Sequence, residues 1–286
     1  MNRLPPMIDV HLHLGNFYRL DYPRILPLTA EALVDKMDRV GIERGVLLPL
    51  ESPEVGGYML TEQAVAARDL YPDRFLAFCC VDPRFPRAAE FIDHAVTQWG
   101  CVGFGEHLNG LAFDDPKNMA VYAKCAEHHL PVLFDMNADA CWDDPGLPRL
   151  ERCLQEFPTV PFLGHGPRFW QALSGDDGVP SGAGGHCPLY PPGPVAPGGA
   201  VDRLATDYDN LWLDLSARSG YNALTRDPEY TAEFVARHWQ NMLFGTDYYA
   251  AHHPMLQVEW LRELKVSEER REAMGAGNAR RLLGLS

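Results

Sequence analysis

Short apolar runs recur along the chain and alternate with segments of helical periodicity. The intervening segments, such as "TAEALVDKMDRVG" and "PRAAEFIDHAVTQWG", repeat apolar residues every three or four positions and mostly end at Gly or Pro, as helices do. The apolar runs are too short for helices of ordinary length and are predicted to be strands. The predicted strands are 8–14, 45–50, 75–82, 101–108, 131–136, 160–166, 211–217 and 242–248.

This alternation predicts an α/β fold. Near-continuous apolar strands separated by helices are typical of a parallel sheet that helices cover. Eight strand–helix units in 286 residues predict a single-domain (β/α)₈ TIM barrel that spans residues 1–286. A doubly wound open sheet is the alternative fold.

One interval between predicted strands is longer than the others and is dense in Gly and Pro. Residues 174–200, after the sixth strand, are predicted to form a long loop that either covers the barrel mouth as a lid or is disordered. Near the C-terminus, "SEERREAMGAGNARRLLGL" predicts a helical segment with a Gly-rich middle that packs Leu282, Leu283 and Leu285. We find no sign of a second domain.

The composition is that of a soluble globular protein, with 46% hydrophobic and 22% charged residues. The net charge of −14 disfavours nucleic acid and anionic membranes as partners and favours a small-molecule substrate. Seven cysteines without a CxxC pair indicate reduced thiols. Because we find neither a signal peptide nor an apolar run of 18 residues, we expect a cytoplasmic location.

Ionisable side chains gather where the predicted strands end. In a (β/α)₈ barrel the chemistry lies at the carboxyl ends of the strands, so these residues are expected to share one site. They are the types that bind metals or carry protons. The strand-end residues are His11, His13, Glu106, His107, Asp135, His165 and Asp247.

His11 and His13 stand two residues apart in the first predicted strand. Alternate residues of a strand point to the same face, so both imidazoles can reach one cation. Alone, such a pair could equally be hydrogen-bonded core histidines. Carboxylates are rarely buried without a partner or a metal, and three of them are predicted at strand ends, where the barrel predicts a cluster, which favours a metal site.

Five motifs carry a family resemblance. "DVHLHLG", "GFGEHL", "FLGHG", "LFGTDY" and "GNARRLLGL" resemble the metal-dependent amidohydrolase superfamily. They are more similar to its amidohydrolase-related branch, which includes aminocarboxymuconate semialdehyde decarboxylase, resorcylate-type decarboxylases and lactone hydrolases. The resemblance implies a (β/α)₈ barrel, His11, His13 and Asp247 as metal ligands, and His165 as a ligand or proton carrier.

Two positions depart from this pattern. Relatives commonly carry a histidine at the end of the fifth strand, where "PVLFDM" places Asp135. Asp135 could be an oxygen ligand, hold a ligand histidine or bind substrate, and we favour one of the first two roles. Glu106 resembles the glutamate that bridges two metals in TatD-type nucleases of the superfamily. The chain is thus expected to bind one or two divalent ions, Zn²⁺ best, with Mn²⁺, Fe²⁺ or Ni²⁺ as alternatives.

Further polar residues fall on the loops that follow the sixth and seventh strands. An arginine there could hold a carboxylate or phosphate, so the small-molecule substrate could be anionic. The residues predicted to bind substrate are Arg168, Trp170, Ser219, Asn222 and Arg226.

Other histidines are interpreted as structural. His107 should face away from Glu106 in a regular strand, and His128 and His129 close a helix, where a cation suits the helix dipole. His186 and Cys187 form an isolated pair in a Gly/Pro-rich loop, which is usually a surface feature.

Hydrolysis of an ester, lactone or amide through a metal-activated water is the leading functional hypothesis. Asp247 would move the proton of the water, and His165 would bind a second metal or stabilise the oxyanion. A non-oxidative decarboxylase of a carboxylated small molecule is the alternative. A non-catalytic metal barrel is a third interpretation, and a TatD-like nuclease is disfavoured by the acidic charge. The protein could be a homo-oligomer.

Overall fold

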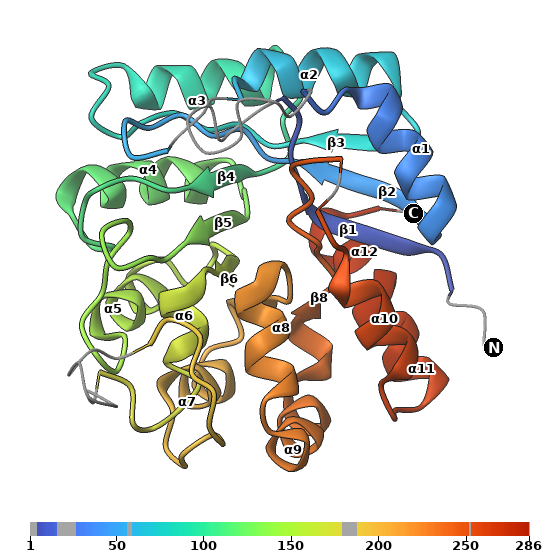
Figure 1. Cartoon of the computed structure of the whole chain (residues 1–286). Helices are drawn as coiled ribbons and strands as arrows, with labels where there is room; N and C mark the ends of the chain where they lie inside the picture. The colour runs from blue at the N-terminus through green and yellow to red at the C-terminus, as the bar shows by residue number, and fades with distance from the viewer. Residues whose placement is uncertain (1–4, 16–26, 56–58, 179–187, 252, 286) are drawn as a thin grey trace.

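The computed structural model describes residues 5–15, 27–55, 59–178, 188–251 and 253–285. Eight parallel strands alternate with helices in this part of the chain (Figure 1). The strands are β1 (Met7–Leu12), β2 (Ile42–Leu47), β3 (Phe75–Ala77), β4 (Phe104–His107), β5 (Val132–Asp135), β6 (Phe162–His165), β7 (Leu211–Asp214) and β8 (Met242–Leu243). Each lies inside or overlaps one predicted strand, and most are shorter.

Helices follow each strand. Several begin where the sequence supplies a cap: the side chain of Thr29 accepts a hydrogen bond from Ala32 N, and Asp115 and Asp227 cap helices that start with proline. The helices are α1 (Ala30–Val40), α2 (Thr61–Leu70), α3 (Ala88–Thr97), α4 (Pro116–Glu127), α5 (Pro148–Glu156), α6 (Pro167–Gln171), α7 (Ala200–Asp207), α8 (Ala217–Thr225), α9 (Pro228–His238), α10 (Leu256–Glu263), α11 (Glu268–Glu272) and α12 (Asn278–Leu283).

The strands follow one another in chain order around a TIM barrel. Regular pairing runs from β1 to β3 and from β4 to β8. Parallel bridges join the two sheets, one between Cys79 and Phe104 and the other between Leu12 and Tyr248, and Val10 N donates to Phe244 O over 3.0 Å. Because neighbouring strands are consecutive in sequence, the doubly wound alternative is wrong.

The core has two layers, as expected of a barrel. One cluster of apolar side chains fills the barrel, including Val10, Leu133, Leu163 and Leu243, and a larger cluster lies between the strands and the helices. The C-terminal segment contributes Ala276 and Ala279 to the inner cluster, and the packing of Leu282, Leu283 and Leu285 against it is confirmed.

The long interval between β6 and β7 contains α6 and α7, with irregular backbone between them in the described residues. Ser174 Oγ accepts from Ala196 N over 2.8 Å, so the two described arms of the loop are bonded to each other. Residues 179–187 of the predicted 174–200 loop lie outside the described residues, and its role as a lid stays a prediction.

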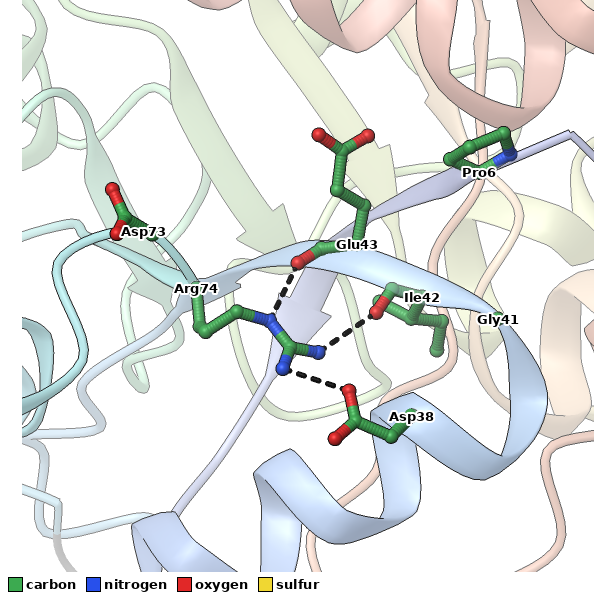
Figure 2. A pocket seen from close by; sticks show the side chains of 7 residues that line it. All are labelled: Pro6, Asp38, Gly41, Ile42, Glu43, Asp73 and Arg74. Carbon is green, nitrogen blue, oxygen red and sulfur yellow. Dashed lines mark hydrogen bonds and ion pairs between the residues drawn. The ribbon is translucent and has the colours of Figure 1, made fainter.

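The amino-terminal end of the barrel carries a pocket of about 610 Å³, shown in Figure 2. Arg74 crosses it, and its guanidinium donates to Glu43 O and Ile42 O and pairs with Asp38 at 2.8 Å. All three guanidinium nitrogens therefore have partners. This arrangement ties the loop before β3 to β2 and suits a structural role, because the amino-terminal face of such barrels usually contributes to stability.

Candidate metal centre

The carboxyl ends of the strands bring seven ionisable side chains together inside the barrel. In β5, β6 and β7 the last residue stands two positions after an inward apolar residue, and therefore points to the same side: Leu133 precedes Asp135, Leu163 precedes His165, and Trp212 precedes Asp214. Six of the seven residues were predicted from the sequence. The set is His11, His13, Glu106, Asp135, His165, Asp214 and Asp247.

Four of these side chains form a first donor group: the Nε2 atoms of His11 and His13 lie 3.0 Å apart, and Glu106 and Asp247 each lie close to both. Glu106 Oε2 lies 3.6 and 3.3 Å from the two nitrogens, and Asp247 Oδ1 lies at the same two distances. Ligand atoms around a tetrahedral ion with bonds of about 2.1 Å are about 3.4 Å apart. These donors therefore fit one divalent ion.

A second donor group adjoins the first through Glu106. Glu106, Asp135 and His165 each offer a ligand atom within 4.8 Å of the others, and Glu106 Oε1 lies 3.9 Å from His165 Nε2. Asn137 Nδ2 donates to the Asp135 carboxylate, 3.0 Å from each oxygen. Glu106 Oε2 thus faces the first donor group and Glu106 Oε1 faces the second.

Hydrogen bonds on the far side of each imidazole aim its Nε2 into the centre. His13 Nδ1 lies 2.8 Å from Leu48 O, which can only accept, so Nδ1 carries the proton and Nε2 the lone pair. His11 Nδ1 lies 2.7 Å from Asp214 Oδ2, and His165 Nδ1 lies 3.1 Å from the same oxygen. Partners of this kind fix the tautomer and orientation of metal-binding histidines.

Asp214 and Ser216 were not singled out from the sequence. Asp214 ends β7 in "LWLDLSA", and both side chains are fully buried, with exposed fractions of 0%. The rule that selected the other strand-end residues applies equally to Asp214, so the signal was present.

The centre is electrostatically polarised. Burial opposes charge on His11, but the carboxylates of Glu106 and Asp214 raise its pKa well above the usual value. Burial raises the pKa of Glu106, and His11 and His13 outweigh this and hold it well below its usual range. Burial and the neighbouring Glu106 carboxylate raise the pKa of Asp135 to about 7. The carboxylates thus favour positive charge on the imidazoles, and the imidazoles favour negative charge on Glu106.

Asp247 is held in a sparsely populated backbone conformation, with φ of +54°. Asp247 N donates to His11 O over 2.9 Å, and the preceding Thr246 donates to the buried carboxylate of Asp9. Its side chain is 21% exposed, more than those of the histidines and Glu106 around it. Such backbone strain is typical of functional sites, and here it turns the carboxylate towards His11 and His13.

Several residues predicted to bind substrate contact the long loop instead of an open cavity. Arg168 pairs with Asp177, Asn222 Nδ2 donates to Pro191 O over 3.3 Å, and Arg226 Nη1 donates to Gly193 O over 3.2 Å. Their contacts hold the described arms of the loop to α6 and α8, and substrate contact stays a prediction.

Trp170 and Ser219, the other two residues predicted to bind substrate, are buried. Trp170 Nε1 donates to Asp214 O over 3.1 Å, which ties α6 to the end of β7. Ser219 Oγ has no hydrogen-bond partner within the described ranges. For these residues too, contact with substrate stays a prediction.

Arg218 and Tyr190, which were not singled out from the sequence, contact each other, and Tyr190 lies within electrostatic range of the centre. The Arg218 guanidinium lies 5.1 Å from the centre of the Tyr190 ring. Burial raises the pKa of Tyr190, Arg218 opposes this, and the carboxylates of Asp135 and Asp247 add to the rise. The ring therefore lies within electrostatic range of two carboxylates of the centre.

Two of the histidines interpreted as structural, His107 and His128, make packing or ion-pair contacts outside the metal centre. His107 packs between the rings of Phe104 and Tyr122, and burial lowers its pKa to about 4. His128 Nε2 pairs with Asp93 at 2.6 Å. His186 and Cys187 lie outside the described residues.

A (β/α)₈ barrel with histidines and carboxylates converging at the carboxyl ends of its strands defines a class of barrel metalloenzymes. The amidohydrolase family profile matches residues 8–285. The chain belongs to the amidohydrolase family and is an enzyme of that superfamily. No curated protein matches the sequence significantly.

Solved structures share the fold. A TIM-barrel protein from Bordetella bronchiseptica, Bb4693, is 20% identical to this chain, with a TM-score of 0.71. The match covers 97% of this chain and 98% of the Bordetella chain. A dihydroxybenzoic acid decarboxylase from Polaromonas sp. JS666, with bound manganese and the inhibitor 2-nitroresorcinol, is 15% identical (TM-score 0.62, 98% and 97% covered). The 5-carboxyvanillate decarboxylase LigW from Sphingomonas paucimobilis is 16% identical (TM-score 0.61, 99% and 100% covered).

Proposed function

We propose that this chain is a metal-dependent hydrolase that acts on a small carbonyl compound, an ester, a lactone or an amide. The observation that supports it best is Glu106, whose Oε2 lies 3.3 Å from His13 Nε2 and whose Oε1 lies 3.9 Å from His165 Nε2. A carboxylate between two donor groups suits two ions, and paired ions are common in hydrolases.

Zinc is the ion that we favour. His11, His13, Glu106 and Asp247 would hold one ion, and Glu106, Asp135 and His165 a second, because mixed imidazole and carboxylate donors suit Zn²⁺. Manganese, bound in the Polaromonas decarboxylase, is an alternative, as are Fe²⁺ and Ni²⁺. When bound, such ions polarise a carbonyl oxygen and lower the pKa of water towards about 7.

Asp247 would be the proton carrier. Its carboxylate is partly exposed and lies beside His13, so it can reach both a water that enters from solvent and a substrate above the histidines. It accepts a proton as the water attacks the carbonyl carbon, and it gives this proton to the leaving oxygen or nitrogen as the carbonyl–heteroatom bond breaks. His165 would stabilise the developing oxyanion or hold the second ion.

The substrate is proposed to be small and anionic. Arg218 is exposed, stacks on Tyr190 and forms no ion pair with any residue in the described ranges, so it is available for a substrate carboxylate. The net charge of −14 speaks against nucleic acid or an anionic membrane as a partner. No helix in the described part of the chain is long and apolar enough to cross a membrane.

A cytoplasmic location remains our proposal. Six cysteines in the described residues are free and buried, which suits a reducing compartment. A homo-oligomer also stays a proposal.

Non-oxidative decarboxylation is the second candidate. Two observations favour it: several structural neighbours are named decarboxylases, and the carboxyl group of Asp135, with a pKa of about 7, could carry a proton to the carbon that loses CO₂. Asp135 is paired in register with His165 on the neighbouring strand, so acid and imidazole lie side by side.

One assay separates the two candidates. The zinc-loaded and manganese-loaded protein is incubated with dihydrocoumarin and with 4-acetoxybenzoate, an ester that carries a carboxylate, and separately with 2,6-dihydroxybenzoate and 5-carboxyvanillate. A hydrolase releases acid from the first pair, measured by pH-stat titration. A decarboxylase releases CO₂ from the second pair. Release of CO₂ with no hydrolysis of either ester would contradict our proposal.

Glu106→Gln is expected to reduce bound zinc from two ions per chain to one or fewer. An amide cannot bridge two cations as a carboxylate does, and its NH₂ group would face one donor group. Bound metal is measured by plasma emission spectrometry after gel filtration, with Glu127→Gln, an exposed substitution on α4, as the matched control. A wild-type chain with a single ion that Glu106→Gln leaves unchanged would favour the decarboxylase.

A further inference from the structure

A single buried oxygen lies behind two imidazoles of the centre. Asp214 Oδ2 is 2.7 Å from His11 Nδ1 and 3.1 Å from His165 Nδ1. Ser216 Oγ completes the group, 2.7 Å from Asp214 Oδ2, 3.1 Å from His11 Nδ1 and 2.9 Å from His165 Nδ1. His11 belongs to the first donor group and His165 to the second, so Asp214 touches both.

The distances identify this group as a hydrogen-bond network and not as a third ion site. His11, His165 and Asp214 could in principle share a cation. However, 2.7 Å between His11 Nδ1 and Asp214 Oδ2 is a short hydrogen-bond distance and is less than the about 3.4 Å expected between ligands of one tetrahedral ion. An ion here would also draw both imidazoles away from the main centre.

The protons of the network can be assigned. As a carboxylate, Asp214 can only accept, so His11 Nδ1 and the Ser216 hydroxyl donate to it. Once the hydroxyl proton points to Asp214, Ser216 Oγ is an acceptor for His165 Nδ1. Both imidazoles then carry their protons on Nδ1, and both Nε2 lone pairs face the centre.

The local backbone holds this carboxylate in place. Ser216 N donates to Asp214 Oδ1 over 3.0 Å. Two residues after the neighbouring strand β8, a Cβ at Gly245 would lie 2.4 Å from Asp214 Oδ1, so glycine leaves the room that the carboxylate needs. The position of Asp214 is therefore determined by its own loop and by its neighbour, independently of the imidazoles.

We infer that Asp214, assisted by Ser216, is a shared positioning residue that fixes the tautomer and orientation of His11 and His165 and so couples the two donor groups. The inference rests on the metal centre of the proposed function and assigns a role to two residues outside the ligand set. Its consequence is specific: loss of this one carboxylate weakens both ion sites, although it coordinates neither ion.

The test measures zinc affinity without any substrate. Asp214→Asn is compared with wild type by competition against a chromophoric chelator, and visible absorption after Co²⁺ loading reports the ligand geometry. We expect about 10- to 100-fold weaker binding at both sites, in line with other substitutions behind metal-binding histidines, and an altered Co²⁺ spectrum. Asp143→Asn is the matched control, because Asp143 is also a buried carboxylate but, among the described residues, accepts only from the backbone N–H groups of residues 144, 149 and 150.

Ser216→Ala is the second variant if Asp214→Asn does not fold. It removes one acceptor but leaves Asp214 in contact with both imidazoles, so we expect a smaller loss, of about 10-fold. Wild-type affinity in Asp214→Asn, or weaker binding at one site only, would overturn the inference, and so would a wild-type chain that binds no ion. Tight metal binding without ester or lactone hydrolysis would overturn the hydrolase proposal alone.

Discussion

Asp247→Asn is expected to lower the turnover of the hydrolase by about 10³-fold or more while the barrel stays folded. The amide can neither accept the proton of the attacking water nor return it to the leaving group. The fold should tolerate the change because the Asp247 side chain is 21% exposed and its backbone N–H, which bonds His11 O, is kept. Turnover is measured with the ester or lactone that the wild-type protein hydrolyses fastest.

Two controls distinguish the role of Asp247 from a nonspecific loss of turnover. Asp209→Asn replaces an exposed aspartate before β7, at the opposite end of the barrel, and should keep wild-type turnover. The metal content of Asp247→Asn shows whether the carboxylate acts mainly as a ligand or as a proton carrier. Full activity in Asp247→Asn would rule out both roles.

Removing the metal is expected to abolish turnover and to lower the melting temperature by about 10 °C. Without ions, the carboxylates of Glu106, Asp135, Asp214 and Asp247 share a small, mostly buried volume. An ion present at about 1,000 times its dissociation constant stabilises the folded state by about 4 kcal/mol, which for a domain of this size corresponds to roughly that shift.

The experiment compares chelator-treated protein with the same sample after addition of Zn²⁺ or Mn²⁺. Scanning fluorimetry gives the melting temperature, and turnover is followed in parallel. In a His11→Ala, His13→Ala double variant both responses to added ion should be much smaller, because one donor group is dismantled. Undiminished turnover in protein shown to be free of metal would contradict a metal-dependent mechanism.

The residues of each strand that point into the barrel could be predicted from the sequence. The two-residue period that places Leu133 and Leu163 inside the barrel also places Asp135 and His165 at its mouth. Asp214 obeys the same rule after Trp212 and was overlooked because no motif of the resemblance includes it. The strand prediction was too long at 242–248, because only Met242–Leu243 pair regularly and the backbone after them is irregular until Tyr248 forms a single bridge with Leu12.

The contacts of the loop residues could not be predicted from the sequence in the same way. Arg168, Asn222 and Arg226 stand where substrate-binding side chains of a barrel stand, yet they bond to Asp177, Pro191 and Gly193 of the long loop. A polar residue in a loop has no periodicity that tells which way it points. Its partner depends on the path of a segment distant in sequence, and that path is set by packing.

The sequence by itself predicted eight strand–helix units in a single domain and the residue types at the strand ends, because the periodicity of strands and helices is a local property of the chain. The strand order of the structure then excluded the doubly wound sheet. Only the tertiary structure decided how these residues divide into groups. The positions of the two Glu106 oxygens, and of Asp214 behind His11 and His165, depend on close approaches between β1, β4, β6 and β7. Contacts of that kind join residues up to 203 positions apart, and no local pattern encodes them.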